Sequence, residues 1–190
     1  DRSPPFPQDR LPRYGSLDFF VENGLSGIDR RFLVDMIGPC RHSEPLAGRI
    51  NVVPGIGMAA QTAPANVLAK IARAYVEDPQ PEGGTKSFLV QTQELISRLL
   101  DMERYDLCLI DARAGLNETT AASLLGVGTD ILLFGRNDRQ TRDGYRFLLA
   151  HLGDLQKNGP DPDWFRSLQT VFARAPKSVE AHRRFADSLY

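Results

Sequence analysis

Asp111 is the residue whose type and setting point most directly to chemistry. It ends the mostly apolar run Tyr105-Asp-Leu-Cys-Leu-Ile-Asp111, and Gly115 follows four residues later. Such a run predicts a buried strand that carries a carboxylate to the edge of a sheet. Ligands of α/β proteins bind outside the carboxyl ends of parallel strands. We therefore expect Asp111 at a ligand-binding edge, where a carboxylate can hold Mg²⁺ on a phosphate.

A second apolar run, Asp130-Ile-Leu-Leu-Phe-Gly135, predicts another strand, and residues 118–125 predict a helix in the crossover between the two. Right-handed crossovers make such strands parallel, so Asp111 and Asn137 are expected at the same sheet edge. The pair Asn137-Asp138 is also typical of a helix N-cap, and the cap is the favoured interpretation.

The remaining pattern predicts a single α/β domain over residues 16–190, behind an irregular proline-rich lead-in over residues 1–15. The fold class expected is a three-layer arrangement with a mostly parallel sheet flanked by helices. Further helices are expected after Ser16 and Asp29 as caps, over 67–75, 88–102 and 141–155, and from Pro176 onward. Further strands are expected over 49–54, before a loop at 55–63, and over 168–173.

Composition narrows the function classes. The chain has 190 residues, 42% of them hydrophobic, with a net charge of −1 and two cysteines. These values fit one domain with a substantial core and give no overall charge that favours nucleic acid or an anionic membrane. No apolar run reaches the roughly 20 residues that span a bilayer, and no Cys or His spacing indicates zinc. A soluble protein of the reducing cytoplasm is expected.

The order of these features resembles the ParA/MinD-type P-loop ATPases (deviant Walker A, SIMIBI class). The similarity is to the branch whose Walker B segment reads Asp-x-Arg-x-Gly, here Asp111-Ala-Arg113-Ala-Gly115, and it covers about residues 15 to 150. The segments that carry it are Gly15-Ser-Leu-Asp-Phe-Phe, Ile50-Asn-Val-Val-Pro-Gly, Tyr105-Asp-Leu-Cys-Leu-Ile-Asp-Ala-Arg-Ala-Gly-Leu and Asp130-Ile-Leu-Leu-Phe-Gly-Arg-Asn.

The resemblance implies Mg²⁺ and ATP as cofactors, hydrolysis of ATP, and ATP-controlled dimerisation that positions cargo or regulates a partner protein. It makes Asp111 the Walker B carboxylate, reaching Mg²⁺ directly or through water. It also places Arg113 near a phosphate or a partner subunit's nucleotide, Gly115 in the loop that senses the γ-phosphate, and Asn137 near the nucleotide.

The chain departs from this family at the phosphate loop, because no G-x-x-x-x-G-K-[ST] sequence occurs in it. That loop supplies the backbone amides and the lysine that hold the phosphates. We therefore expect the chain to be the distal portion of a longer ATPase and to be inactive by itself.

Other interpretations stay open. Asp111 can cap a turn by accepting the amides of Arg113 or Ala114. It can also be the phospho-acceptor of a receiver-like domain, although the acidic pair and lysine of such a domain are not in place. A third interpretation is an α/β interaction domain that does not use nucleotide.

DNA binding is a further open question, raised by a run of arginines after the second predicted strand. Asp138 and Asp143 interleave with them, which favours a solvated helix face over a phosphate-binding surface. The arginines are Arg136, Arg139, Arg142 and Arg146.

Overall fold

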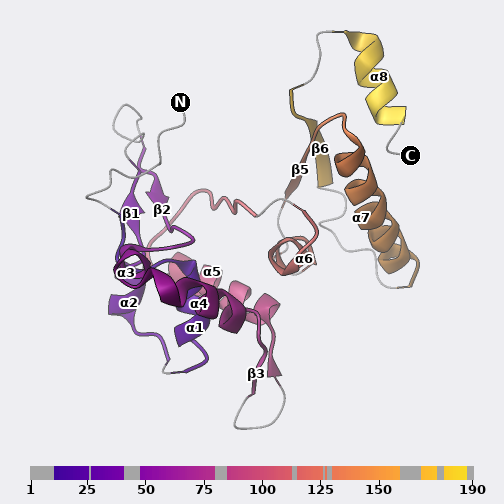
Figure 1. The fold of residues 1–190 in the computed structure, drawn as a ribbon. Helices are drawn as coiled ribbons and strands as arrows, with labels where there is room; N and C mark the ends of the chain where they lie inside the picture. Colours follow the sequence, from indigo (N-terminus) through magenta and orange to yellow (C-terminus); the bar gives the residue numbers. More distant parts are fainter. Residues whose placement is uncertain are drawn as a thin grey trace. The chain divides into compact units, whose positions relative to one another are not determined.

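The computed structural model describes residues 11–25, 27–40, 48–79, 85–112, 115–125, 127, 130–158, 168–174 and 178–187. It is a mixed α/β structure rich in helix, with small two-stranded sheets (Figure 1). Its contacts divide the chain into two compact units, Asp1–Cys108 and Leu109–Tyr190. Most of the proline-rich lead-in lies outside the described residues.

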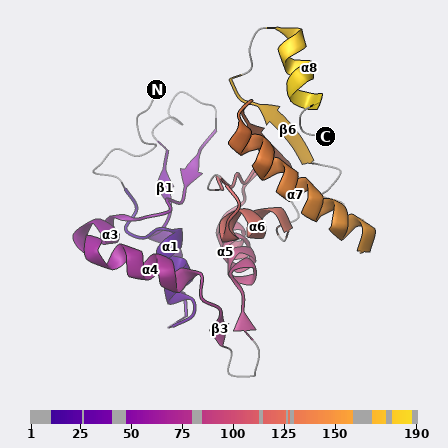
Figure 2. The ribbon, with the colours of Figure 1, turned by 45° about the vertical axis from the view of Figure 1, so that its right-hand side comes forward.

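The first unit contains helices α1 to α5 and two antiparallel strand pairs. Phe19, Met36 and Leu95 are buried at its core, and α1 and α4 lie side by side in both ribbon views (Figures 1 and 2). The helices are α1 (Ser16–Glu22), α2 (Arg30–Val34), α3 (Met58–Thr62), α4 (Val67–Ala74) and α5 (Phe88–Met102), with a 3₁₀ turn at Pro64–Asn66. The strands are β1 (Gly38–Pro39), paired with β2 (Asn51–Val52), and β3 (Asp78–Pro79), paired with β4 (Thr85–Lys86).

Local capping explains where these helices begin. The predicted cap of α2 is confirmed, because the amide of Phe32 donates a 2.8 Å hydrogen bond to the Asp29 carboxylate. The prediction of Ser16 as the cap of α1 is wrong by one residue: Gly15 is the N-cap, and its amide donates to the buried carboxylate of Asp18. A carboxylate at the third helical position can satisfy that amide, so the cap needs no side chain.

Helices α1 and α3 also cap one another. The first amides of α1, at Ser16 and Leu17, donate to the carbonyls of Pro54 and Gly55 at 2.9 and 3.1 Å. The first amides of α3 donate at 2.9 Å to the carbonyls of Pro12 and Arg13. Each helix therefore satisfies unpaired amides with the loop that precedes the other helix. The prediction of a loop over residues 55–63 is therefore wrong in part, because Met58–Thr62 forms α3, whose first amides are capped by the segment before α1.

The second unit is built on a parallel β-α-β arrangement. Strand β5 (Ile131–Gly135) pairs in parallel with β6 (Leu168–Phe172), and α7 (Arg139–Asn158) makes the crossover (Figures 1 and 2). Leu148 and Leu152 of α7 pack on Ile131, together with Leu124 of α6 (Glu118–Leu125). Helix α8 (Val179–Asp187) follows β6. The strands predicted at 130–135 and 168–173 and these helices are confirmed, while the proposed helix start at Pro176 lies outside the described residues. The parallel pair predicted from the sequence was 105–111 with 130–135, whereas the structure pairs β5 with β6.

Two predicted strands differ from the structure. Only Asn51–Val52 of the run 49–54 is a strand, and it pairs antiparallel with β1. The run Tyr105–Asp111 is neither helix nor strand, so the prediction of a strand there is wrong for this structure. Helix α6 therefore does not connect two paired strands, as the sequence had predicted. The physical reason is the lack of a partner, since a strand is stable only when its backbone groups pair with a neighbour, and no described strand pairs with this run.

Candidate functional site

Asp111 is exposed, at the end of a segment whose apolar side chains are also exposed. Leu107 and Leu109 retain 72% and 83% of their accessible surface. Among the described residues, no hydrogen bond or ion pair occupies the Asp111 carboxylate. Its alternative role as a turn cap involves the amides of Arg113 and Ala114, which lie outside the described residues, as does the predicted phosphate contact of Arg113.

Gly115 has a φ of +97°, a backbone conformation that residues with a side chain rarely adopt. Its carbonyl accepts a 2.6 Å hydrogen bond from the Thr120 hydroxyl. Asn117 caps the start of α6, because its side-chain oxygen accepts from the amides of Thr119 and Thr120 at 3.1 and 3.2 Å. The loop after Asp111 is therefore fixed to α6 from Gly115 onward.

The sequence interpretation did not identify Asn117, although an asparagine directly before a helix is a usual N-cap signal. Asn117 joins Gly115 to the helix together with Thr120, since its side-chain amide also donates to the Gly115 carbonyl at 3.3 Å.

Asn137 and Asp138 lie between β5 and α7, as predicted. Asp138 is the helix cap, because its carboxylate accepts a 2.8 Å hydrogen bond from the Thr141 amide. Hydrogen bonds from the Thr141 backbone and side chain hold the pKa of Asp138 below its usual value, despite its exposure. Asn137 is exposed, and its side-chain oxygen accepts from Arg142 at 2.8 Å. No contact between described residues joins Asn137 to Asp111.

The arginines of this region are solvated or paired within the chain. Arg139 lies 3.4 Å from Asp143, and Arg136 lies 3.8 Å from Asp138. The exposed pair of Arg139 and Asp143, four residues apart on α7, is the arrangement expected of a solvated helix face.

Tyr145 packs over the carboxyl end of β5. A Cβ built on Gly135 would lie 2.9 Å from a ring carbon of Tyr145 and 3.1 Å from its hydroxyl, so only glycine allows this approach. The hydroxyl is buried and has no hydrogen-bond partner among the described residues. Burial raises the pKa of Tyr145 to about 12.

In the first unit, a polar cluster holds the start of the Tyr105–Asp111 run beside β2. The side-chain amide of Asn51 donates to the Tyr105 hydroxyl at 3.2 Å and to Glu103 at 3.3 Å. Arg49 forms an ion pair with Glu103. The apolar runs 49–54 and 105–111, both predicted as strands, therefore begin next to each other. Their sequences alone do not reveal this contact.

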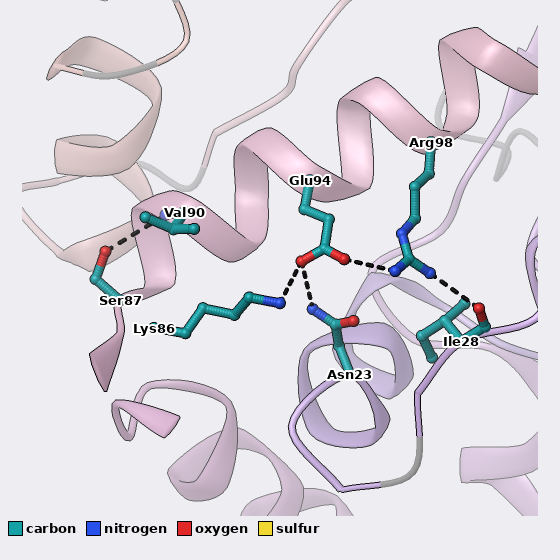
Figure 3. Close-up of polar contacts among 7 residues, drawn as sticks. All are labelled: Asn23, Ile28, Lys86, Ser87, Val90, Glu94 and Arg98. Atoms are coloured by element: carbon teal, nitrogen blue, oxygen red, sulfur yellow. Dashed lines mark hydrogen bonds and ion pairs between the residues drawn. The ribbon is translucent and has the colours of Figure 1, made fainter. Parts of the chain in front are cut away.

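A second cluster of the first unit centres on Glu94 of α5 (Figure 3). Its carboxylate contacts Lys86, the Asn23 amide at 3.0 Å and Arg98 at 2.6 Å, and Arg98 also donates to the carbonyl of Ile28. Burial alone would raise the pKa of Glu94, but the hydrogen bonds from Lys86 and Asn23 and the charges of Lys86 and Arg98 together hold it below its usual value. The satisfied partners make this cluster a structural tie between α1, β4 and α5.

A hollow of about 240 Å³ lies between α6 and α7, lined by Leu116, Leu124, Phe147 and His151 among others.

Within the described ranges, no group of three or more His, Cys, Asp or Glu side chains is placed to bind a metal ion. No helix in that part of the chain is both long and apolar enough to cross a membrane.

Comparison with known proteins gave no further assignment: no protein-family model, no curated protein and no solved structure matches this chain.

Proposed function

We propose that this chain is the Walker B portion of a ParA/MinD-like ATPase, which binds Mg²⁺-ATP and uses hydrolysis to control dimerisation and the positioning of a partner or cargo. The observation that carries the proposal is the setting of Asp111. It is an exposed carboxylate at the end of an apolar run, and four residues later Gly115 adopts a left-handed conformation and leads into a capped helix. The parallel β5-α7-β6 unit that follows supports the same reading.

The single carboxylate of Asp111 fits a metal ion whose other ligands are nucleotide and water. Mg²⁺ typically keeps several waters and takes one or two carboxylates plus phosphate oxygens, so a single exposed carboxylate at Asp111 suits it. When bound, the ion would neutralise phosphate charge during hydrolysis. Asp111 would orient the water shell of that ion, Gly115 would let the loop approach the γ-phosphate, Arg113 would contact a phosphate, and Asn137 would lie near the nucleotide.

The phosphates themselves need a loop of backbone amides and a lysine, which these 190 residues do not contain. In the proposal, a strand, Gly-rich loop and helix elsewhere in the complete protein supply them. The fold of that protein is a three-layer α/β domain with a mostly parallel sheet.

The open edge of β5 supports this fold. The amide of Ala173 donates to the carbonyl of Gly135, so Gly135 bonds toward β6. Alternate residues of a parallel ladder bond to the same neighbour, and Leu132 and Phe134 therefore direct their backbone groups to the other edge. Among described residues, no strand pairs there. A strand bearing the phosphate loop would satisfy those groups and help to cover the exposed Phe134 side chain.

The alternative that retains support is an interaction domain that does not use nucleotide, because the hollow between α6 and α7 is largely apolar and its rim residues Leu116 and Phe147 are exposed. Sedimentation of the complete protein with ATP, with ADP and without nucleotide separates the two. The ATPase proposal predicts a dimer that forms with ATP and dissociates with ADP. A sedimentation profile that is identical in all three conditions would favour the interaction domain.

A further inference from the structure

One edge of strand β5 is paired with no described strand, and the pairing of the other edge shows which backbone groups face it. The amide of Ala173 donates to the Gly135 carbonyl at 2.7 Å, so Gly135 directs its backbone groups to β6. Residues an odd number of positions from Gly135 along the strand direct theirs to the opposite side. The amides and carbonyls of Leu132 and Phe134 therefore face the unpaired edge, where a further strand can bond to them.

The side chains of β5 alternate between a buried and an exposed face. Ile131 is buried and Leu133 is half-buried, and both belong to the apolar cluster shared with α7. Leu132 and Phe134 lie on the opposite face and retain 53% and 67% of their accessible surface. Paired residues of neighbouring strands lie on the same face of a sheet. A strand at this edge would therefore place side chains of its own directly beside Leu132 and Phe134.

The segment that forms β5 is complementary to itself when two copies run in opposite directions about Leu133. An antiparallel pairing centred there sets the outward backbone groups of Leu132 opposite those of Phe134 of a second copy. It also sets Asp130, which is exposed, opposite Arg136 of that copy, whose side chain is 60% exposed. Aliphatic–aromatic and opposite-charge pairs both stabilise neighbouring strands. Two-fold symmetry makes each of these contacts occur twice.

We infer that β5 is a dimerisation edge, at which two copies of this chain pair their β5 strands antiparallel about Leu133 and form one continuous sheet. The charge order favours a second copy, because a strand with another order would set like charges opposite one another. The ion pair of Arg136 with Asp138, at 3.8 Å between exposed side chains, is weak enough to leave Arg136 available. The pairing is closed, since each β5 edge is used once.

This inference concerns the 190-residue chain and is independent of the proposed function. The two occupants of the edge exclude one another, so a strand that a longer protein supplies there would take the place of the second copy.

The test is charge reversal in the 190-residue chain, followed by sedimentation at increasing concentration without nucleotide. Asp130→Arg and Arg136→Asp each set like charges opposite one another at both ends of the pairing. Each should therefore raise the dissociation constant of the dimer roughly 5- to 30-fold. Asp143→Arg makes the same charge change on the exposed face of α7 and is the matched control, which should dimerise as the wild type does.

The decisive sample is an equimolar mixture of Asp130→Arg and Arg136→Asp. Each variant there meets the complementary charges of the other, so dimers should form at wild-type concentrations. The double variant, which carries both reversals, should also dimerise as the wild type does. Circular dichroism of each variant checks that it is folded.

Three results would overturn the inference. The first is a wild-type chain that stays monomeric at every concentration. The second is wild-type association of both single variants, which would mean that the chains meet at another surface. The third is a mixture that associates no more than its separate components, which would exclude the antiparallel register about Leu133. None of these results bears on the ATPase proposal, which Asp111→Ala tests separately.

Discussion

Gly15 and Gly57 lie in backbone contact: a Cβ built on Gly15 would come within 2.8 Å of the Gly57 amide nitrogen. Each glycine is the N-cap of a helix, α1 and α3 respectively, and each stands three residues after a proline, Pro12 or Pro54. The contact lets the two loops exchange hydrogen bonds with each other's helices. It joins the start of α1 to the segment that follows β2.

Replacing Gly57 by alanine should therefore destabilise the first unit. The added Cβ would lie 2.4 Å from the carbonyl carbon of Tyr14, which is backbone and has little freedom to move. Overpacking of this kind costs about 1–3 kcal/mol, measured as the free energy of unfolding in urea. Gly55→Ala is the matched control, because nothing lies within 4 Å of its Cβ position. Equal stabilities for the two variants would contradict the interlocked arrangement.

Asn117→Ala should loosen the loop that follows Asp111. It removes the side-chain oxygen that accepts the Thr119 and Thr120 amides, and loss of an N-cap costs about 1 kcal/mol. Hydrogen exchange at the first amides of α6 should accelerate. Asn66→Ala serves as the control, since Asn66 occupies the N-cap position of α4 without a side-chain capping bond. Unchanged exchange in Asn117→Ala would show that Asn117 does not cap α6.

The Glu94 cluster predicts a loss of stability in acid. The pKa of Glu94 is held below its ordinary value of 4.5, so the carboxylate stabilises the folded state above that pH. This contribution is lost as the pH falls through the lowered folded-state pKa.

Glu94→Gln should cost about 1–2 kcal/mol at pH 7 and flatten the pH dependence of unfolding below pH 4.5. The exposed Glu180, which pairs with Arg184 at 3.9 Å, provides the control Glu180→Gln. A pH profile for Glu94→Gln that parallels the wild-type profile would exclude this role for the cluster.

The 190-residue chain should self-associate. Leu109 is 83% exposed, and Phe134 is 67% exposed on β5, one edge of which is paired with no described strand; such surfaces favour association between chains. Sedimentation should show species larger than a monomer as concentration increases. Leu109→Lys combined with Phe134→Lys should reduce their amount. A wild-type monomer at high concentration would argue for a self-sufficient domain.

Sequence periodicity was sufficient for most individual elements. Helices α4 to α7 and strands β5 and β6 follow from apolar spacing and local caps, because both act over a few residues. It failed at Tyr105–Asp111, where an apolar run indicates a strand only if a neighbour pairs with it. It also missed the Asn51–Tyr105 hydrogen bond and the mutual caps of α1 and α3, since these join residues more than 35 positions apart.

In the candidate site, too, some features could be predicted from the local sequence and others could not. Asp138 was predictable as a helix cap, and Gly115 as a residue that needs backbone freedom. The expected meeting of Asp111 and Asn137 depends on sheet order rather than on local sequence, and the described residues supply no strand that would bring them together. That relationship stays a prediction of the proposed fold.

The most direct test of the central claim is Mg²⁺-dependent ATP hydrolysis by the complete protein with Asp111→Ala. Asp106→Ala, which removes an exposed carboxylate from the same segment, is the control. We predict that Asp111→Ala abolishes hydrolysis at every Mg²⁺ concentration, whereas Asp106→Ala keeps wild-type turnover. Unchanged turnover in Asp111→Ala would contradict the assignment of Asp111 as the Walker B carboxylate.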